Sequence, residues 1–323
     1  MFNSINKFVE KNKLIQDGDK LVLGLSGGPD SIFLLHYLLE LQKKIKFDFV
    51  ACHLDHEWRK ESQQDLLFCQ GIAEQNGIQF VGKKTSELNF EPKKTGSKED
   101  LGRRLRRFFF ESVAKEVGAN KIALAHHLQD QQETFFIRLI RGSSLSGLCS
   151  MRPQAGIYVR PLLEVSKKDI LQYLNEFDFE YVIDPTNVSE DFLRNRIRKF
   201  VLPALIQSDD RFDLGFLKTI EKLQMADDYL NGVVQTFLKE HATQADIGLK
   251  IDLKAFLGLD KIVLDRVLIS GLIQAKVPFL PTQALLDEIE RFLHGRESGL
   301  HSVGSDWGVF KDLKQGLFWV CRH

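Results

Sequence analysis

Apolar positions in the first half of the chain recur at two spacings, one typical of buried strands and one typical of helices. Leu21–Leu25 is a short apolar run, and the apolar residues that follow it after a break return at helical spacing. Such runs predict a buried strand and then a helix. The break between them is the string Ser-Gly-Gly-Pro-Asp-Ser at residues 26–31. It predicts a strand-to-helix turn made of small, polar and acidic groups.

The same alternation continues as far as about Val165. The predicted strands are Leu21–Leu25, Phe47–His53, Gln79–Gly82, Lys121–Ala125 and Ile157–Arg160. The predicted helices are Asp30–Lys43, Arg59–Glu74, Lys98–Val117 and Asp130–Arg141. This order predicts an α/β fold with a doubly wound, mostly parallel sheet. Ligands bind such sheets at the carboxyl ends of the strands, so polar residues that follow different strands should gather at one edge.

Beyond about Ile206 the pattern becomes mainly helical. A long helical pattern covers residues 216–241, and shorter ones cover 261–274 and 285–295. Residues 299–320 alternate around glycine-rich turns and predict a small β-meander. We therefore expect two domains, a sheet domain over residues 1–206 and a smaller, mainly helical domain over 207–323 that ends in the meander.

Composition narrows the class of protein. Hydrophobic residues make up 43% of the chain, which is ordinary for a globular protein. We find neither an apolar stretch of about eighteen residues nor a secretory signal, so we expect a cytoplasmic protein without membrane contact. The cysteines are scattered without a CxxC pair, which argues against disulfides and against a zinc or iron–sulfur site. They are Cys52, Cys69, Cys149 and Cys321.

The formal net charge is zero, but basic residues cluster in two segments. Residues 93–107 hold seven basic and two acidic residues, and residues 194–199 hold four basic residues. Helical spacing puts Arg103 and Arg106 on one face, and Arg194 and Arg198 on another. Such faces suit contact with a phosphate backbone, although charge runs also occur on ordinary solvated helix faces.

The turn at residues 26–31 has the chemistry of a phosphate site. The glycines permit a close backbone approach, the proline suits the first turn of a helix, and the serines add hydroxyl donors. Asp30 would repel a phosphate unless Mg²⁺ lay between them. The turn has neither the Walker lysine nor the dinucleotide-binding glycine pattern. An ordinary strand-to-helix turn with a capping residue is the other interpretation.

A second acidic turn follows the fourth predicted strand. Asp130 and Glu133 should share one face of a helix, where one could contact Mg²⁺ and the other an ammonium group. His126 and His127 precede them and could donate to phosphate or position a substrate. A capping aspartate in an acidic first turn would give the same pattern. Zinc is not expected, because no cysteine or third histidine lies at ligand spacing.

Together these strings resemble a known family. The string at residues 26–31 is similar to the SGGxDS loop of the PP-loop ATP pyrophosphatases, which adenylate a substrate and release pyrophosphate. Further stretches narrow the resemblance to the tRNA(Ile)-lysidine synthetases. They are HLDHEWR at 53–59, HHLQDQQET with the following RG, GL and M at 126–151, RPLLEVSKKDI at 160–170, and DPTNVSEDFLRNRIRKFVLP at 184–203.

The resemblance implies an enzyme that joins L-lysine to the wobble cytidine of a tRNA(Ile) with a CAU anticodon. ATP would adenylate the cytidine, pyrophosphate would leave, and lysine would displace AMP to give lysidine. ATP and Mg²⁺ would be the cofactors, and the helical domain would also contact the tRNA. A monomer or a homodimer is expected.

The resemblance also assigns roles to residues. The residues expected to hold ATP are Ser26, Gly27, Gly28, Pro29, Asp30, Ser31 and His53. Asp30 and Asp130 would share Mg²⁺. The catalytic positions would be Asp30, Asp130, Glu133 and His126. The residues expected on phosphates of the tRNA or the adenylate are Arg103, Arg106, Arg194 and Arg198. Gln129 stands where many members of the family carry an aspartate.

Two other functions remain open from the residues. A PP-loop tRNA thiolase, or another adenylating tRNA-modifying enzyme, would share the first loop, but thiolases usually need paired or catalytic cysteines. NAD and GMP synthetases share that loop alone. A non-enzymatic nucleotide-binding regulator would need none of the three acids Asp30, Asp130 and Glu133.

Overall fold

The chain divides into two compact units, Met1–Glu221 and Lys222–His323. The computed structural model describes residues 1–59, 61–90, 97–183, 193–279, 281–304 and 306–322, so the string at 184–192 lies outside the described residues. The division falls later than residue 206, inside helix α10 (Phe212–His241). The start of α10 packs on the first unit, where Phe216 contacts Phe135 edge to face and Asp213 accepts a hydrogen bond from Gln132.

The first unit is built on a six-stranded sheet in the order β3-β2-β1-β4-β6-β5. The first five of these strands are parallel, and β5 pairs antiparallel to β6. This confirms the mostly parallel α/β fold. The two-residue strand β5 was not predicted, because so short a segment leaves no pattern. The strands are β1 (Lys20–Gly24), β2 (Asp48–Asp55), β3 (Phe80–Lys84), β4 (Lys121–Ala123), β5 (Gln154–Ala155) and β6 (Tyr158–Val159).

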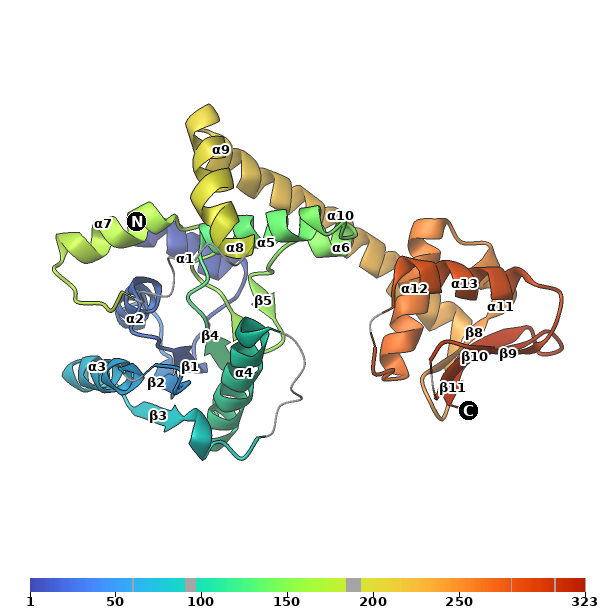
Figure 1. Cartoon of the computed structure of the whole chain (residues 1–323), viewed down its shortest axis with the longest axis horizontal. Coiled ribbons are helices and arrows are strands. Elements are labelled where there is room, and N and C mark those ends of the chain that lie inside the picture. The colour runs from blue at the N-terminus through green and yellow to red at the C-terminus, as the bar shows by residue number, and fades with distance from the viewer. Residues whose placement is uncertain (60, 91–96, 184–192, 280, 305, 323) are drawn as a thin grey trace. The chain divides into compact units, whose positions relative to one another are not determined.

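Helices cover both faces of this sheet (Figure 1). One face carries α1 (Phe2–Lys11), α2 (Pro29–Gln42), α3 (Ser62–Gln75) and α7 (Lys167–Glu176). The other face carries α4 (Lys98–Val117), which lies across the sheet from α2 and α3. Helix α2 is largely buried, because aromatic rings of α1 and α7 pack on its Phe33. Its N-terminus is thereby fixed at the carboxyl end of β1.

The remaining segments of the first unit are short apart from α5 and α10. The bounds are η1 (Thr85–Glu87), α5 (Leu128–Ile140), α6 (Leu145–Leu148), α8 (Leu193–Arg196), a π-helical turn η3 (Ile197–Val201) and α9 (Leu202–Ser208). Helix α5 begins two residues earlier than predicted, because His127 and Asp130 together cap its N-terminus.

The second unit contains a five-stranded antiparallel sheet in the order β7-β8-β11-β10-β9. The predicted meander is confirmed as β9 (Gly299–Ser302), β10 (Trp307–Asp312) and β11 (Leu317–Arg322). Two further strands were missed, β7 (Ala242–Gln244) and β8 (Leu249–Asp252). The helices after β8 are α11 (Leu253–Leu257), α12 (Lys261–Gln274) and α13 (Gln283–His294).

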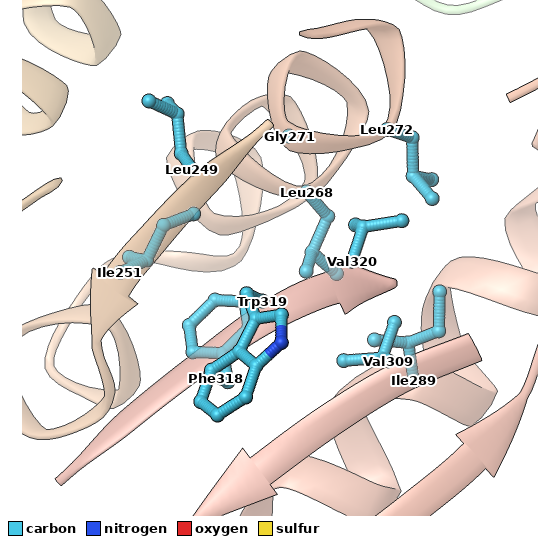
Figure 2. A pocket seen from close by; sticks show the side chains of 10 residues that line it. All are labelled: Leu249, Ile251, Leu268, Gly271, Leu272, Ile289, Val309, Phe318, Trp319 and Val320. Atoms are coloured by element: carbon cyan, nitrogen blue, oxygen red, sulfur yellow. The ribbon is translucent and has the colours of Figure 1, made fainter. Parts of the chain in front are cut away.

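Apolar side chains of this sheet and of α12 and α13 form the core of the second unit. Figure 2 shows Val309 and Phe318 facing Leu268 and Ile289 around a small cavity. Its volume of about 10 Å³ leaves room for at most one water molecule, and its apolar lining offers that water no hydrogen-bond partner. None of the helices in the described ranges is both long and apolar enough to cross a bilayer.

Candidate active site

The turn between β1 and α2 is a compact loop closed by its own hydrogen bonds. The hydroxyl of Ser31 donates to the carbonyl of Gly28 at 2.9 Å and accepts from the backbone N–H of Ser26 at 3.1 Å. Gly28 is the residue before α2, and Pro29 is its first residue. The positive end of α2 therefore faces the loop, which favours an anion there.

Gly27 is required in this loop for two reasons. Its φ is +81°, a backbone angle that residues with a side chain rarely adopt. A Cβ at this position would also lie 3.3 Å from Sγ of Cys69 and 3.3 Å from the ring of Phe68. The backbone carbonyl of Gly27 accepts a hydrogen bond from Val182 at 2.9 Å. The loop is thus held against α3 on one side and the segment after α7 on the other.

His53 supports the loop from β2. Its Nδ1 lies 2.9 Å from the carbonyl oxygen of Leu25, to which it donates in the matching tautomer, and 3.4 Å from Sγ of Cys69. Burial lowers the pKa of His53, so the ring is neutral at physiological pH. His53 is 8% exposed, and its bond to Leu25 fixes the residue directly before Ser26.

His127 joins the two acids that were predicted to share a metal. Its Nδ1 accepts the backbone N–H of Gln129 at 3.2 Å, which leaves the proton on Nε2. That Nε2 lies 3.6 Å from Oδ2 of Asp30 and 3.6 Å from Oδ2 of Asp130. Carboxylates from the first turns of α2 and α5 therefore converge on one imidazole at the carboxyl edge of the sheet.

Burial acts in opposite directions on Asp130 and His126, but the pKa of each group lies below its ordinary value. Burial alone would raise the pKa of Asp130, but His127, His126 and the backbone N–H of His127 outweigh it and hold that pKa below its ordinary value. Burial lowers the pKa of His126 to about 4. Nδ1 of His126 is buried and, among the described residues, has no hydrogen-bond partner. The ring is therefore a neutral group with an unused nitrogen.

Glu133 is fully buried and paired. Its two carboxylate oxygens accept from Nε and Nη2 of Arg198 at 2.6 and 3.1 Å, and Nε of Arg194 lies 3.5 Å from Oε2. Burial raises the pKa of Glu133 against the pull of Arg198. Although burial alone would lower the pKa of Arg198, its bond to Glu133 raises it, so we regard the pair as ionised. The structure brings these two arginines to Glu133.

A lysine that was not predicted completes the cluster. Nζ of Lys167 lies 2.6 Å from Oδ1 of Asp30, and the backbone N–H of Lys167 donates to Oε1 of Gln129 at 2.8 Å. Gln129 therefore ties the start of α7 to the start of α5. The sequence offered little signal for Lys167, because 137 positions separate it from Asp30.

Asp30 and Asp130 offer a fit to Mg²⁺. Both supply carboxylate oxygens, which Mg²⁺ prefers. Asp30 belongs to the loop that would hold phosphate, and His127 brings Asp130 next to it. Mg²⁺ commonly takes one or two carboxylates together with phosphate oxygens and water. Convergence of two carboxylates on one point meets that requirement.

Arg103 and Arg106 are exposed on α4. Arg103 pairs with Asp100 at 2.8 Å. The pKa of His56 is lowered to about 4, chiefly by burial and then by the charge of Arg106. The same guanidinium also contributes to the lowered pKa of His126, after burial and the charge of Arg160.

The comparisons with known proteins agree with this geometry. A family model described as the PP-loop domain matches residues 2–205. The chain therefore belongs to the PP-loop family, whose fold and phosphate loop it carries.

Its relatives identify the branch of that family. The tRNA(Ile)-lysidine synthase of Bacillus cereus is 30% identical over 97% of this chain and 68% of that protein. The tRNA(Ile)-lysidine synthase of Clostridium acetobutylicum is 34% identical over 83% of this chain and 59% of that protein. The chain belongs to the tRNA(Ile)-lysidine synthase family, and it spans about three fifths to two thirds of the length of these relatives.

A solved structure shares the fold. The U34-tRNA thiolase NcsA from Methanococcus maripaludis, solved with its 4Fe–4S cluster, is similar with a TM-score of 0.58 and 18% identity. The match covers 68% of this chain and 78% of that chain.

Proposed function

We propose that the protein ligates L-lysine to the wobble cytidine of a tRNA(Ile) with a CAU anticodon, in an ATP-dependent reaction. The chain belongs to the tRNA(Ile)-lysidine synthase family, and one structural observation supports this reaction. The phosphate loop, Asp30, Asp130 and Glu133 meet at the carboxyl edge of one parallel sheet. The location and the donor types suit an adenylation reaction with an incoming amine.

The reaction would proceed in two displacements. The ring carbonyl oxygen of the cytidine attacks the α-phosphorus of ATP, an oxygen–phosphorus bond forms, and pyrophosphate leaves. The ε-amine of lysine then attacks the ring carbon, AMP leaves with the oxygen, and the amine loses its proton. A loop without a Walker lysine fits this chemistry, since it would hold the departing pyrophosphate rather than a transferred γ-phosphate.

The residues of the chain would divide this work. The amides and hydroxyls of the loop would orient the phosphates, and Asp30 and Asp130 would hold Mg²⁺, which neutralises phosphate charge when bound. Glu133 would receive the lysine ammonium or its proton. Its raised pKa supports the second role, because a base with a pKa nearer neutrality transfers protons more efficiently. Arg198 would then have to give up its bond to Glu133.

The thiolase alternative is not favoured by the cysteines. All four are free. Burial raises the pKa of both Cys52 and Cys69 to about 12, so neither thiol supplies a thiolate at physiological pH. Cys321 belongs to the second unit, whereas the candidate site residues belong to the first. A regulator without catalysis gives no reason for two acids to converge beside the phosphate loop.

The test is incorporation of labelled lysine into tRNA. Protein, ATP and Mg²⁺ are incubated with tRNA(Ile) carrying CAU, and with methionine tRNA carrying the same anticodon as a specificity control. We expect label in the isoleucine tRNA, release of AMP and pyrophosphate, and no label with Asp30→Asn. Absence of label with folded, ATP-binding protein would refute the proposal. Because tRNA is the proposed substrate, the cytoplasm is the proposed location.

A further inference from the structure

Lys167 is anchored more firmly than an ordinary surface lysine. It is the first residue of α7, and its backbone N–H is held by the side chain of Gln129 at 2.8 Å. One residue further along α5 toward the N-terminus, the N–H of Leu128 donates to the carbonyl of Val165 at 3.0 Å. These two bonds fix the root of the lysine against the turn that carries Asp130. Its ammonium reaches Asp30, which lies in the first turn of α2 beside the phosphate loop.

The contact between Lys167 and Asp30 is open to exchange. The side chains are 33% and 29% exposed, so solvent reaches both groups. Ion pairs with this degree of exposure contribute little to stability. A structural role alone therefore gives weak reason for a lysine to be positioned so closely here.

Phosphates would supply a stronger partner for this ammonium. The loop at residues 26–31 contains no basic residue, although the triphosphate of ATP carries several negative charges. The guanidiniums of Arg194 and Arg198 are directed at Glu133. Mg²⁺ bound to Asp30 would occupy the carboxylate that Lys167 now contacts. The ammonium would then lie next to a metal-bound phosphate with its former partner taken.

We propose that Lys167 is a phosphate-binding residue that exchanges Asp30 for phosphate oxygens when ATP and Mg²⁺ bind. The inference rests on the proposed use of ATP and does not depend on which substrate is adenylated. Lys167 would supply from α7 the positive charge that other phosphate loops obtain from their own lysine.

The first test measures binding of a non-hydrolysable ATP analogue by calorimetry, with Mg²⁺ and without tRNA. Lys167→Met should weaken binding by about tenfold or more, the size expected for loss of a hydrogen bond to a charged group. Lys167→Arg should stay within about threefold. Lys168→Met is the matched control, because Lys168 is the exposed next residue of the same helix, and it should bind as the unmodified protein does.

The second test uses pyrophosphate alone, in the presence of a chelator. Asp30→Asn should strengthen binding, because Lys167 loses its carboxylate partner. The gain in pyrophosphate affinity should be clearly smaller when Asp30→Asn is combined with Lys167→Met. In that protein the only remaining cause of a gain is the lost negative charge of Asp30. Equal gains on the two backgrounds would overturn the proposal. So would unchanged analogue affinity of a folded Lys167→Met protein, with folding checked by its thermal midpoint.

The outcomes separate this inference from the proposed function. Normal analogue binding that depends on Lys167, without lysine incorporation into tRNA, would support the inference and refute the lysidine reaction. Failure of the unmodified protein to bind the analogue would overturn both.

Discussion

Removal of Arg198 tests the ion pair of the fully buried Glu133. Glu133 is 0% exposed and accepts both of its bonds from Arg198, so Arg198→Met would leave a buried carboxylate with Nε of Arg194, 3.5 Å away, beside it. Breaking a fully buried pair costs about 3–5 kcal/mol. Because the Arg198 side chain is 43% exposed, water can enter and reduce the loss, and we expect about 2 kcal/mol.

The loss should appear as a lower melting temperature of the first unit. For a unit of this size, about 2 kcal/mol corresponds to a decrease of about 4–8 °C. Differential scanning calorimetry would follow the transition that ATP and Mg²⁺ shift upward, since a ligand stabilises the unit that binds it. Arg196→Met is the matched control, an exposed arginine on the adjacent helix α8.

The pH dependence of this loss has a definite sign. Burial already raises the pKa of Glu133 in the folded protein, and removal of Arg198 should raise it further. A carboxyl with a folded pKa above its unfolded value binds protons more readily when folded, so stability falls as pH rises between the two values. The decrease in melting temperature should therefore be larger at pH 8 than at pH 5.

A double variant decides whether the orphaned charge is the cause. Glu133→Gln removes that charge, so Arg198→Met combined with Glu133→Gln should be more stable than Arg198→Met alone. A coupling of about 1–2 kcal/mol is expected for residues in direct contact. Additive effects of the two changes, or a loss that is the same at both pH values, would refute the reasoning.

Three further predictions concern other parts of the molecule. Gly27→Ala should abolish detectable ATP binding in calorimetry, because φ is +81° and Cys69 lies 3.3 Å from the new methyl, whereas Gly71→Ala, with open space in α3, should bind normally and gain about 1 kcal/mol of stability. Replacing Arg103 and Arg106 by glutamine should make the slope of log affinity for tRNA against log salt less steep by about 2. An unchanged slope would show that these arginines do not contact tRNA phosphates. Leu268→Ala, at a 4% exposed position in the second unit, should cost about 3 kcal/mol in thermal unfolding without changing ATP affinity.

The parts of the fold that could be predicted were those whose ends are set by residues nearby in the sequence. Helix α4 has the predicted bounds, because Ser97 caps its start and Gly118 adopts a φ of +69° at its end. The parallel sheet followed from continuous apolar strands between helices. Strands β7 and β8 were missed because they are three and four residues long. β8 is held by β11, far along the chain, and β7 in turn pairs with β8.

The acidic residues and the loop of the candidate site could be grouped from the sequence, but its histidines and cations were harder to place. Asp30, Asp130 and Glu133 follow strands at positions that a parallel sheet brings together, so chain order was sufficient to group them. Sequence favoured His126, but His127 is the residue that contacts both Asp30 and Asp130. The difference depends on which of two adjacent side chains turns toward the helix start, and a strand end does not encode that.

The positions of the two cations, Lys167, which the sequence did not indicate, and Arg198, which it assigned to phosphates, have one physical cause. Carboxylates gathered at a partly dry sheet edge need counter-charges before any ligand arrives. Lys167 neutralises Asp30 and Arg198 neutralises Glu133, and Arg198 also lies 4.0 Å from Asp130. Sequence motifs indicate which ligands a site binds, whereas the folded chain also needs cations that neutralise its own buried carboxylates. On the proposed function, Mg²⁺ and the lysine ammonium would displace these cations from the carboxylates, and Lys167 would then bind phosphate.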